Sequence, residues 1–586
     1  MLNVITDNID LWASAQKKKK AVGRGSSKKF ELYGIKKLRE LILQLAVQGK
    51  LVPQDSNDEP ASELLKKIEA EKNLLIKEKK IKKQKPLPIM STDEMSFKVP
   101  NNWEWIRLGT LGNIFNGNSV SVSKKEALYT NIVSGLAFIA TKDVDYGWKS
   151  LDYDNGISIP KGEEKFKVAH KGAVLICAEG GSAGKKCGIT NQDICFGNKL
   201  FAIETYGNVD SRYLLSNYLT PIFFTQFKEK MSGIIGGISK TNFESLVIPL
   251  PSIKEQLRIA SKIDELMALC DQLEQEETDT KAAHQTLVKT LLNTLTTVKT
   301  AVEFQQSWQR IAEHFDILFT TEESIEELKQ AILQLAVMGK LIPQDPNDEP
   351  ARELLKKIVA KKEKLIKEKK IKKKRTLPPI SDEEKLYDLP EGWEWERLDN
   401  FTVVGTGSTP SRDDFSYYNP PEFNWVTSGE TSNDFVFDTK EKVSEKAIKE
   451  TNVSIYPIGT LIVAMYGQGK TRGQITELMI KAGTNQACAT IQLLETLKEH
   501  RGYIKLFFKK AYKELRSLAS GGAQPNLNVG KISSTVIPIP PLSEQGRIVT
   551  KVDELMTLCD QLKQCMVDSK STQLHLADAI VEQAVV

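Results

Sequence analysis

Residues 43–55, LQLAVQGKLVPQD, return almost unchanged as residues 333–345, LQLAVMGKLIPQD. The match continues through NDEPASELLKKI and NDEPARELLKKI, then through IKEKKIKK in both copies, and ends at a repeated Trp-Glu-Trp triplet. Trp103 corresponds to Trp393, so the last matched residues keep the offset of 290 that the first ones have. A repeat of this length predicts a chain built from two related halves.

A second block repeats further along each half. VIPLPSIKEQLRI, residues 247–259, matches VIPIPPLSEQGRI, residues 536–548, and each is followed by a run of the type DELMALCDQL. Between the two blocks of each half lies a variable region of about 140 residues. The chain therefore alternates nearly constant blocks with two divergent regions.

The constant blocks have the apolar spacing of helices. Apolar residues in the second block recur at alternating spacings of three and four, which predicts a seam facing a partner helix. Cys270 and Cys559 occupy equivalent positions of this seam, where buried thiols are expected. The seam residues are Ile259, Ile263, Leu266, Cys270 and Leu273, and then Ile548, Val552, Leu555, Cys559, Leu562 and Met566.

The first block predicts two shorter helices. One has an apolar face at Leu38, Leu41, Ile42 and Leu45 and ends before Gly49 and Pro53. The other begins near Glu59-Pro60, with proline in its first turn. Its apolar residues are Leu64, Leu65, Ile68 and Leu75.

The variable regions are rich in Gly, Asn, Ser, Thr and aromatic residues and contain short strand-like runs, such as residues 172–177 and 459–464. A basic, glycine-rich loop follows each of these runs, GGSAGKKCG and GQGKTRG. Each region ends with a second Gly-rich segment, residues 232–242 and 520–528. Both regions thus have the loops of a binding domain on related strands.

The predicted fold class is α+β. We expect two mixed α/β domains, separated and flanked by long antiparallel coiled-coil helices, with a pseudo-twofold internal repeat. The predicted segments are an N-terminal helical region 1–98, a first domain 99–250, a central helical region 251–388, a second domain 389–540 and a C-terminal helix 541–586.

Composition narrows the class of protein. Hydrophobic content of 40%, charged content of 27% and a net charge of +5 are those of an ordinary globular protein. No apolar run approaches the ~18 residues of a membrane span, and the N-terminal Lys run follows the apolar stretch, the reverse of a secretory signal. We expect a cytoplasmic protein without membrane contact. The seven cysteines and five histidines have no metal-ligand spacing, so no metal site is expected.

The repeated blocks carry a family resemblance. Residues 31–68, the Trp-Glu-Trp triplets, and IPLPSIKEQLRI with IPIPPLSEQGRI resemble the specificity subunits of type I restriction-modification systems, most closely the IB subgroup. The resemblance implies a non-catalytic subunit with two target-recognition domains, each recognising one half of a bipartite double-stranded DNA site. It implies that antiparallel helices set the spacing of the half-sites.

The same resemblance implies partners and their cofactors. Two methyltransferase subunits and two restriction (motor) subunits assemble with a specificity subunit. S-adenosylmethionine, ATP and magnesium are bound by those subunits, and no cofactor is expected in this chain. The recognised bases, the spacer length and the half-site of each domain are not encoded in any pattern seen here.

Two local matches favour an enzyme. Residues 464–471 nearly form a nucleotide-binding loop, but Ala464 replaces its first glycine and a strand is expected after Thr471 instead of a helix. Residues 419–423, NPPEF, resemble an adenine-methyltransferase loop in which Glu422 displaces the base-stacking aromatic residue. A self-contained restriction-methylation enzyme is therefore a weaker hypothesis, as is a coiled-coil scaffold without a DNA role, because the basic loops would be unexplained.

The loops supply the candidate DNA contacts. Basic side chains in flexible loops can contact phosphates or guanine, and amides can pair with adenine. Arg472 is the candidate for guanine and Lys470 for a phosphate, because only the guanidinium has a planar fork. The alternative for each position is an ordinary turn or cap residue. The candidates are Lys185, Lys186, Lys240, Thr241, Asn242, Lys470, Arg472, Gln474, Gln524, Asn526 and Asn528.

Two repeated features leave alternatives open. Trp103, Trp105, Trp393 and Trp395 could stack on bases, but residues shared by two domains with different targets favour structural anchors. The lysine-rich helices have either solvated faces, the commoner case, or phosphate contacts.

Overall fold

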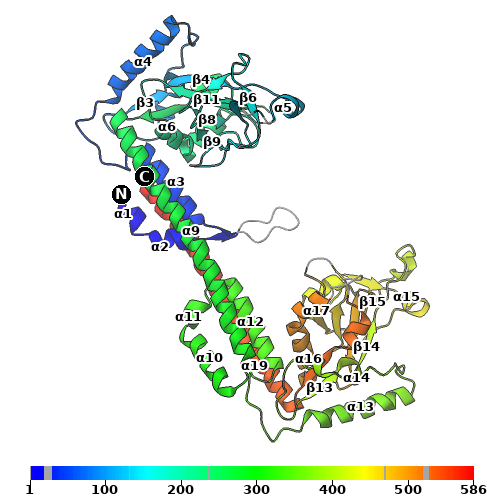
Figure 1. Ribbon diagram of the computed structural model, residues 1–586. Coiled ribbons are helices and arrows are strands. Elements are labelled where there is room, and N and C mark those ends of the chain that lie inside the picture. The colour runs from blue at the N-terminus through cyan, green and yellow to red at the C-terminus, as the bar shows by residue number, and fades with distance from the viewer. Residues whose placement is uncertain are drawn as a thin grey trace. The chain divides into compact units, whose positions relative to one another are not determined.

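The computed structural model describes residues 2–18, 30–130, 132, 134–233, 236–467, 470–518 and 527–585. The chain forms two compact units (Figure 1), unit 1 with residues 1–281 and 568–586, and unit 2 with residues 282–567. Two long helices, α9 (Ile253–Thr297) and α19 (Leu542–Val585), contribute residues to both units. Within the described ranges, no helix has the length and apolar character of a membrane span.

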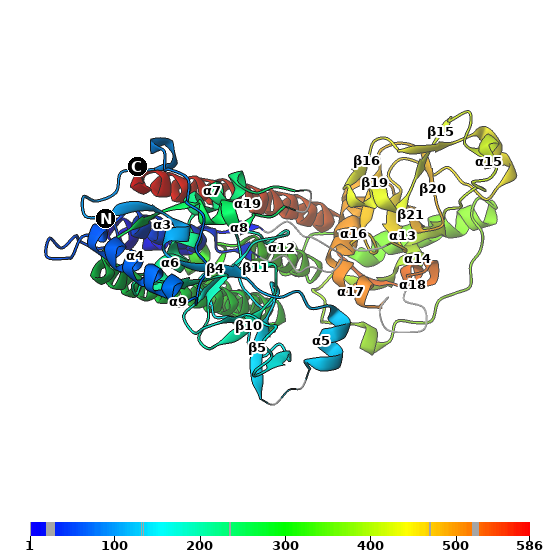
Figure 2. The ribbon, with the colours of Figure 1, turned by 90° about the horizontal axis from the view of Figure 1, so that it is seen from above.

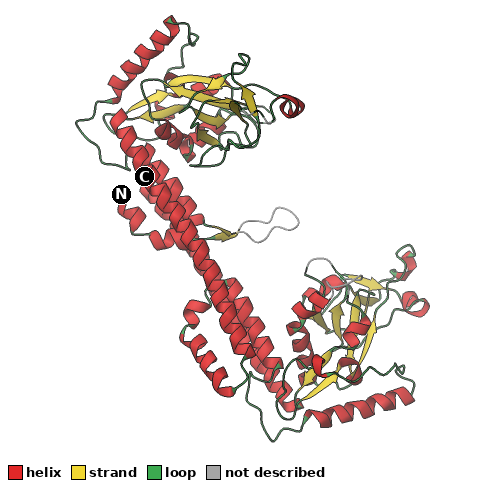
Figure 3. Ribbon diagram, viewed as in Figure 1, coloured by secondary structure: helices red, strands yellow, loops and turns green. Residues whose placement is uncertain are grey.

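Unit 1 combines helices of the constant blocks with strands of the first variable region (Figure 3). Besides parts of α9 and α19, its elements are α1 (Leu2–Thr6), α2 (Ile9–Ser14), β1 (Lys17–Lys18), β2 (Phe30–Glu31), α3 (Tyr33–Val47), α4 (Ala61–Lys77), β3 (Glu104–Arg107), β4 (Gly112–Asn116), α5 (Val122–Leu128), β5 (Gly135–Ile139), β6 (Ser158–Pro160), β7 (Val168–Ala169), β8 (Val174–Cys177), β9 (Cys187–Ile189), β10 (Ile194–Phe196), β11 (Leu200–Thr205), α6 (Ser211–Tyr218), α7 (Pro221–Glu229), α8 (Lys240–Glu244) and β12 (Val247–Leu250).

Unit 2 repeats this order with local additions. Besides parts of α9 and α19, its elements are α10 (Ala301–Glu313), α11 (Phe315–Leu318), α12 (Glu322–Val337), α13 (Ala351–Lys367), β13 (Glu394–Arg397), α14 (Leu398–Phe401), β14 (Thr402–Thr406), β15 (Phe423–Val426), β16 (Phe435–Val436), β17 (Glu441–Val443), α15 (Glu445–Glu450), β18 (Leu461–Ala464), β19 (Ile475–Leu478), β20 (Ala482–Thr484), β21 (Cys488–Leu493), α16 (Lys498–Lys510), α17 (Tyr512–Leu518), α18 (Val529–Ser533) and β22 (Val536–Ile539).

The helical part of unit 1 is built around α3, α9 and α19, with Ile5 of α1 and Trp12 of α2 in the same core. Arg39 of α3 bonds to Asp271 of α9 at 2.5 Å, and Tyr33 donates to Asp578 of α19 at 2.7 Å. Gln54, which follows α3, bonds to Glu255 at the start of α9, so α3 and α9 run antiparallel. The predicted seam is buried here against two helices instead of one. Its core residues are Ile35, Leu38, Leu41, Ile42, Leu45, Ile259, Ile263, Leu266, Cys270, Ala577 and Val581.

Unit 2 has the same arrangement, but here α19 pairs with the shorter helix and the end of α9 completes the core. Lys329 of α12 bonds to Asp560 of α19 at 2.5 Å, and Glu326 bonds to Lys563 at 2.7 Å, which makes α12 and α19 antiparallel. The end of α9 supplies Val288, Leu292 and Leu295 to the core. In the second copy of the seam, Ile548, Val552 and Cys559 are buried, Leu555 and Met566 are half-buried, and Leu562 is 36% exposed.

The second predicted helix of the first block begins one residue later than expected. Pro60 is the N-cap of α4, with φ −67° and ψ 155°, and the helix starts at Ala61. Leu64 and Ile68 are buried, and Leu65 and Leu75 pack at the edge of the same core. The predicted apolar face is confirmed.

The two variable regions share one sheet topology. The main sheet has the order β4-β11-β8-β9 in unit 1 and β14-β21-β18-β19 in unit 2, and these strands are antiparallel. In unit 2, β16 is added at the edge, parallel to β19. The predicted strand runs are β8 and β18 at its centre. A second, mixed sheet pairs β5 with β10 and β15 with β20 in parallel. The internal repeat is therefore structural as well as sequential.

A tryptophan joins each domain to its helices. The Trp103 indole donates to Glu255 of α9 at 2.9 Å, and the Trp393 indole donates to Glu544 of α19 at 3.0 Å. Burial raises the pKa of Glu255, and the same cause raises that of Glu544. The two indoles are only 3% and 6% exposed, so packing, and not stacking on bases, is their role.

An arginine and a glutamate make a second repeated junction. Arg107 bonds through both terminal nitrogens to Glu94 at 2.7 Å and to the Ser245 carbonyl at 2.5 Å. Arg397 bonds to Glu384 in the same way at 2.9 and 2.8 Å. These guanidinium groups lower the pKa of Glu94 to about 2 and that of Glu384 to about 2.

We expect this junction to weaken in acid. The carboxylates have folded-state pKa values of about 2, below the ordinary value of 4.5, so their contribution is present above pH 4.5 and is lost as the pH falls towards 2. The urea midpoint of the full chain should therefore drop between pH 5 and pH 3. The double variant E94Q/E384Q should show a smaller drop, and an equal drop in both proteins would contradict the assignment.

Candidate DNA interface

Two loops of the first domain that are distant in sequence lie together. The loop after β8 meets the Gly-rich segment that precedes α8. The Gly180 amide donates to the Gly236 carbonyl at 2.8 Å, and the Ile238 amide donates to the Ala178 carbonyl at 3.0 Å. The structure thus brings the predicted basic loop and the predicted Gly-rich segment to one place.

The two lysines of this loop differ in their surroundings. Lys185 is exposed, and its ammonium lies 5.8 Å from the centre of the Phe224 ring. Lys186 donates to the Thr141 carbonyl at 3.1 Å and lies over the Tyr146 ring at 5.1 Å. Lys186 therefore holds a neighbouring loop of the same domain, whereas Lys185 is exposed and stays a predicted DNA contact.

The three candidates at α8 also differ in their exposure and in their bonds within the domain. Lys240 and Thr241 are exposed at the first turn, and Lys240 forms an ion pair with Glu244 at 3.4 Å. Asn242 donates its side-chain amide to the Lys230 carbonyl at 3.0 Å, which is a structural bond. The Asn242 side-chain nitrogen is thus used within the domain, and Lys240 and Thr241 remain exposed predicted contacts.

The basic loop of the second domain is fixed through its backbone. Tyr512 of α17 donates to the Lys470 carbonyl at 2.6 Å, and Arg516 donates to the Arg472 carbonyl at 3.4 Å. Lys470 is exposed, whereas Arg472 and Gln474 are half-buried. These two hydrogen bonds fix the backbone from which the Lys470 and Arg472 side chains extend.

The structure also decides against the nucleotide-binding motif. The residues after Thr471 form a turn and then β19, so the helix that such a loop needs does not follow. In the NPPEF segment, the Glu422 carboxylate accepts the Glu445 amide at 2.8 Å, at the start of α15. Both segments have structural roles of their own.

The structure describes Leu527 and Asn528 of the last Gly-rich segment. Asn528 is the N-cap of α18, where its side chain accepts the Lys531 amide at 2.8 Å. This is the cap role that the sequence left open for it. Gln524 and Asn526 lie outside the described residues.

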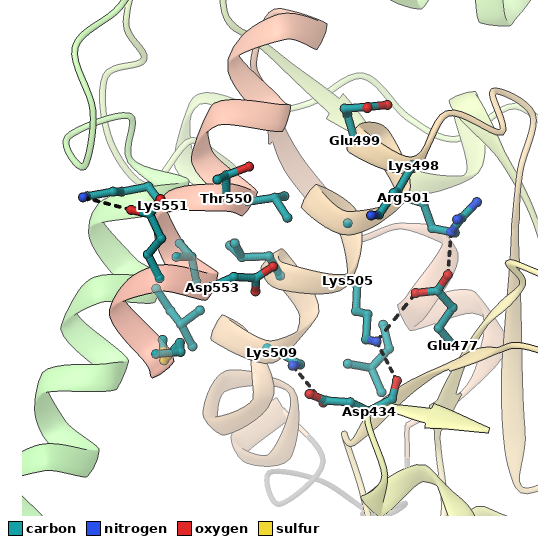
Figure 4. Close-up of a pocket in the computed structure, with 18 of the residues that line it drawn as sticks. Asp434, Glu477, Lys498, Glu499, Arg501, Lys505, Lys509, Thr550, Lys551 and Asp553 are labelled. Atoms are coloured by element: carbon teal, nitrogen blue, oxygen red, sulfur yellow. Dashed lines mark hydrogen bonds and ion pairs between the residues drawn. The ribbon is translucent and has the colours of Figure 1, made fainter. Parts of the chain in front are cut away.

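Several cations that line a groove of unit 2 are paired within the domain. A groove of about 1650 Å³ lies along α16 (Figure 4). In it, Arg501 pairs with Glu477 at 2.6 Å, and Lys509 pairs with Asp434 at 2.8 Å. Lys505 donates to the Asp434 carbonyl at 2.5 Å, and burial lowers its pKa. These cations stabilise the domain and are poor candidates for phosphate contacts.

Two repeated glutamates were not among the residues for which the sequence predicted a role. Glu255 and Glu544 stand in the Glu-Gln pairs of the second constant block, and both prove to be buried acceptors for tryptophans. The repetition of the Glu-Gln pair in both halves was the available signal. Their partners could not be inferred, because 152 and 151 residues separate each pair in the chain.

Known proteins resemble this chain along its whole length. The family model described as the type I restriction modification DNA specificity domain matches residues 100–280 and 390–565. The chain is 39% identical to the type I restriction enzyme EcoAI specificity subunit and 37% identical to the EcoEI specificity subunit, both from Escherichia coli, over 99% of each chain. A crystal structure of the HsdS subunit from Thermoanaerobacter tengcongensis is 16% identical, covering 84% of this chain and 99% of its own, with a TM-score of 0.42.

Proposed function

This chain belongs to the family of type I restriction-modification DNA specificity subunits, and on that premise we propose that its two domains each recognise one half of a bipartite DNA site. It is a non-catalytic subunit with two target-recognition domains, and its partners are DNA and the methyltransferase and restriction subunits. The observation that carries the proposal is the repeat. Two domains with one topology carry different loops, as expected of two readers of unlike half-sites.

The proposal extends to the assembly. Two methyltransferase subunits and two restriction subunits join one specificity subunit, and the long antiparallel helices set the spacing of the half-sites. S-adenosylmethionine, ATP and magnesium bind to those partners. The chemistry that they supply is adenine methylation and ATP-dependent cleavage, and this chain contributes the choice of DNA sequence.

Methylation mapping tests the proposal directly. DNA from cells that express this chain with its methyltransferase partner is sequenced with long reads that detect methyladenine. We expect one motif made of two defined half-sites and a gap of fixed length. Cells with the methyltransferase alone are the control. Methylation that does not depend on this chain, or an undivided motif, would refute two separate readers.

We expect Arg472 and Lys470 to have separable effects on DNA binding. A lost phosphate contact at Lys470 should weaken binding to all sequences and reduce the salt slope by about one. A lost bidentate guanine contact at Arg472 should cost about 1–3 kcal/mol on the cognate site only and relax one base position. Affinities of Lys470→Ala and Arg472→Ala, in complex with the methyltransferase, are measured across salt on cognate and scrambled duplexes.

Thr471→Ala is the matched control, because it changes the same loop without removing charge. Unchanged affinity and specificity in both charge variants would remove this loop from the interface.

A further inference from the structure

Each half of the chain carries a basic arm, defined here as residues 61–85 and 351–375. The arms consist of α4 or α13 and the eight residues that follow each helix. Nine lysines against four glutamates give the first arm a formal charge of +5, and thirteen cations against three glutamates give the second arm +10. Since the whole chain has a net charge of +5, all its other residues together carry −10. The positive charge that a DNA-binding chain needs is concentrated in the arms.

The arms are held firmly on their domains. Ala61, Leu64 and Ile68 belong to the core of the first domain, and the Gly207 amide donates to Glu71 of α4 at 2.7 Å. A side chain at Gly207 would lie 2.7 Å from Ile68, so the contact is close.

The second arm is anchored equally. Lys362 donates to the Thr402 carbonyl at 3.1 Å, and Lys374 bonds to Asp399 at 2.9 Å. Figure 2 shows α13 beside α14. A fixed arm presents its charges at defined places.

Only part of each arm's charge is used internally. Near the helix starts, Lys66 pairs with Glu63 and Lys67 with Glu59, and the second arm repeats both pairs. After residues 81 and 371, six exposed cations have no ion-pair or side-chain hydrogen-bond partner among the described residues. These six are Lys82, Lys83, Lys85, Lys372, Lys373 and Arg375.

The unpaired end of the first arm lies next to the candidate loops. Gln84 accepts from Lys72 at 2.8 Å and donates to Glu244 of α8 at 3.4 Å. Glu244 is also the partner of Lys240, a candidate DNA contact. The cations on either side of Gln84 therefore adjoin the surface that carries the predicted contacts.

The repeat identifies what the arms contact. IKEKKIKK is identical at residues 76–83 and 366–373, although the loops of the two domains differ. An identical element in two readers of different sequences must meet something common to both half-sites, and the phosphate backbone is common to all DNA. A protein interface would instead need an apolar centre depleted in lysine. The large apolar side chains that the arms expose are only Leu74 and Val359 among the described residues.

We propose that the two basic arms bind the DNA phosphate backbone beside each half-site, independently of sequence. This inference rests on the proposed function. The arms supply the salt-dependent affinity, and the loops supply the discrimination between bases.

The test neutralises the unpaired cations in the complex with the methyltransferase. One variant is K82Q/K83Q/K85Q, and a second adds K372Q/K373Q/R375Q. Each lost phosphate contact should reduce the slope of log affinity against log salt by about 0.9, so three losses reduce it by about 2.7. Near 0.1 M salt, the triple variant should bind cognate and scrambled duplexes more weakly by about 100-fold or more. The methylated motif should not change.

The matched control is K66Q/K67Q/K356Q/K357Q, which removes four lysines of the same two arms that are already paired with glutamates. Its salt slope should change by less than one. An unchanged salt slope in the test variants overturns the proposal. If these variants instead assembled more weakly with the methyltransferase, the arms would be a protein-docking surface. An altered methylation motif would also overturn it. Failure of the proposed function is distinguishable, since the wild-type complex would then not prefer cognate over scrambled DNA.

Discussion

Replacing residues 106–246 with the matching region of a related specificity subunit should exchange one half-site completely and leave the other half-site unchanged. The replaced segment begins inside β3 and ends just before β12, and these two strands pair with each other through Ile106 and Ile248. The two four-stranded sheets and most of the core lie between these points, so the donor domain brings most of its own packing, while Ala61, Leu64 and Ile68 of the same core stay with this chain. Methylation mapping in cells with the methyltransferase partner reports both half-sites at once.

The junction sets a condition for this exchange. Arg107 lies inside the replaced segment, whereas its partner Glu94 lies outside it. The donor must therefore supply an arginine at this position. Exchange of residues 396–535, the equivalent segment of unit 2, is the matched experiment and should alter the other half-site. A change of both half-sites in either chimera would be incompatible with independent readers.

Much of the fold could be predicted because the same apolar patterns occur in both halves of the chain. The apolar faces of α3 and α4 and the central strands β8 and β18 were visible as periodic patterns in both copies. The number of helices around each seam was not visible. Periodicity shows that a helix face is buried, but it does not show that α3 and the far end of α19 share the burial.

The candidate site was predictable only as a set of loops. Glycine and lysine in a loop indicate exposure and charge, but they do not show which side chain is used internally. Lys186 and Asn242 satisfy carbonyl groups 45 and 12 residues away, and such long-range partners leave no local pattern. The basic arms were visible as charge runs. Their importance becomes clear only when the exposed, unpaired cations are separated from those in ion pairs.

Trp393→Ala should destabilise unit 2 by about 3–5 kcal/mol, the usual cost of removing a large buried aromatic side chain. The indole packs against Gly339, where a side chain would lie 3.0 Å from the ring, and contacts Tyr503 edge-on at 6.3 Å. Its loss leaves a cavity and takes the indole donor from the buried Glu544 carboxylate. Trp393→Phe keeps much of the ring packing but removes the indole donor, so it should cost less than Trp393→Ala, about 1–3 kcal/mol.

Urea unfolding of the full chain, followed by far-UV circular dichroism, measures these losses. Hydrogen exchange at β13 and β22, which form an antiparallel pair next to the tryptophan, localises them to unit 2. Trp308→Ala is the control, because Trp308 is 42% exposed on α10, so less of its surface is buried and its removal should cost only about 1–2 kcal/mol. If Trp393→Ala behaved like this control, the indole would not anchor the domain, and base stacking would again be open for the repeated tryptophans. If Ala and Phe cost the same, the hydrogen bond to Glu544, and not the packing of the ring, would hold the junction.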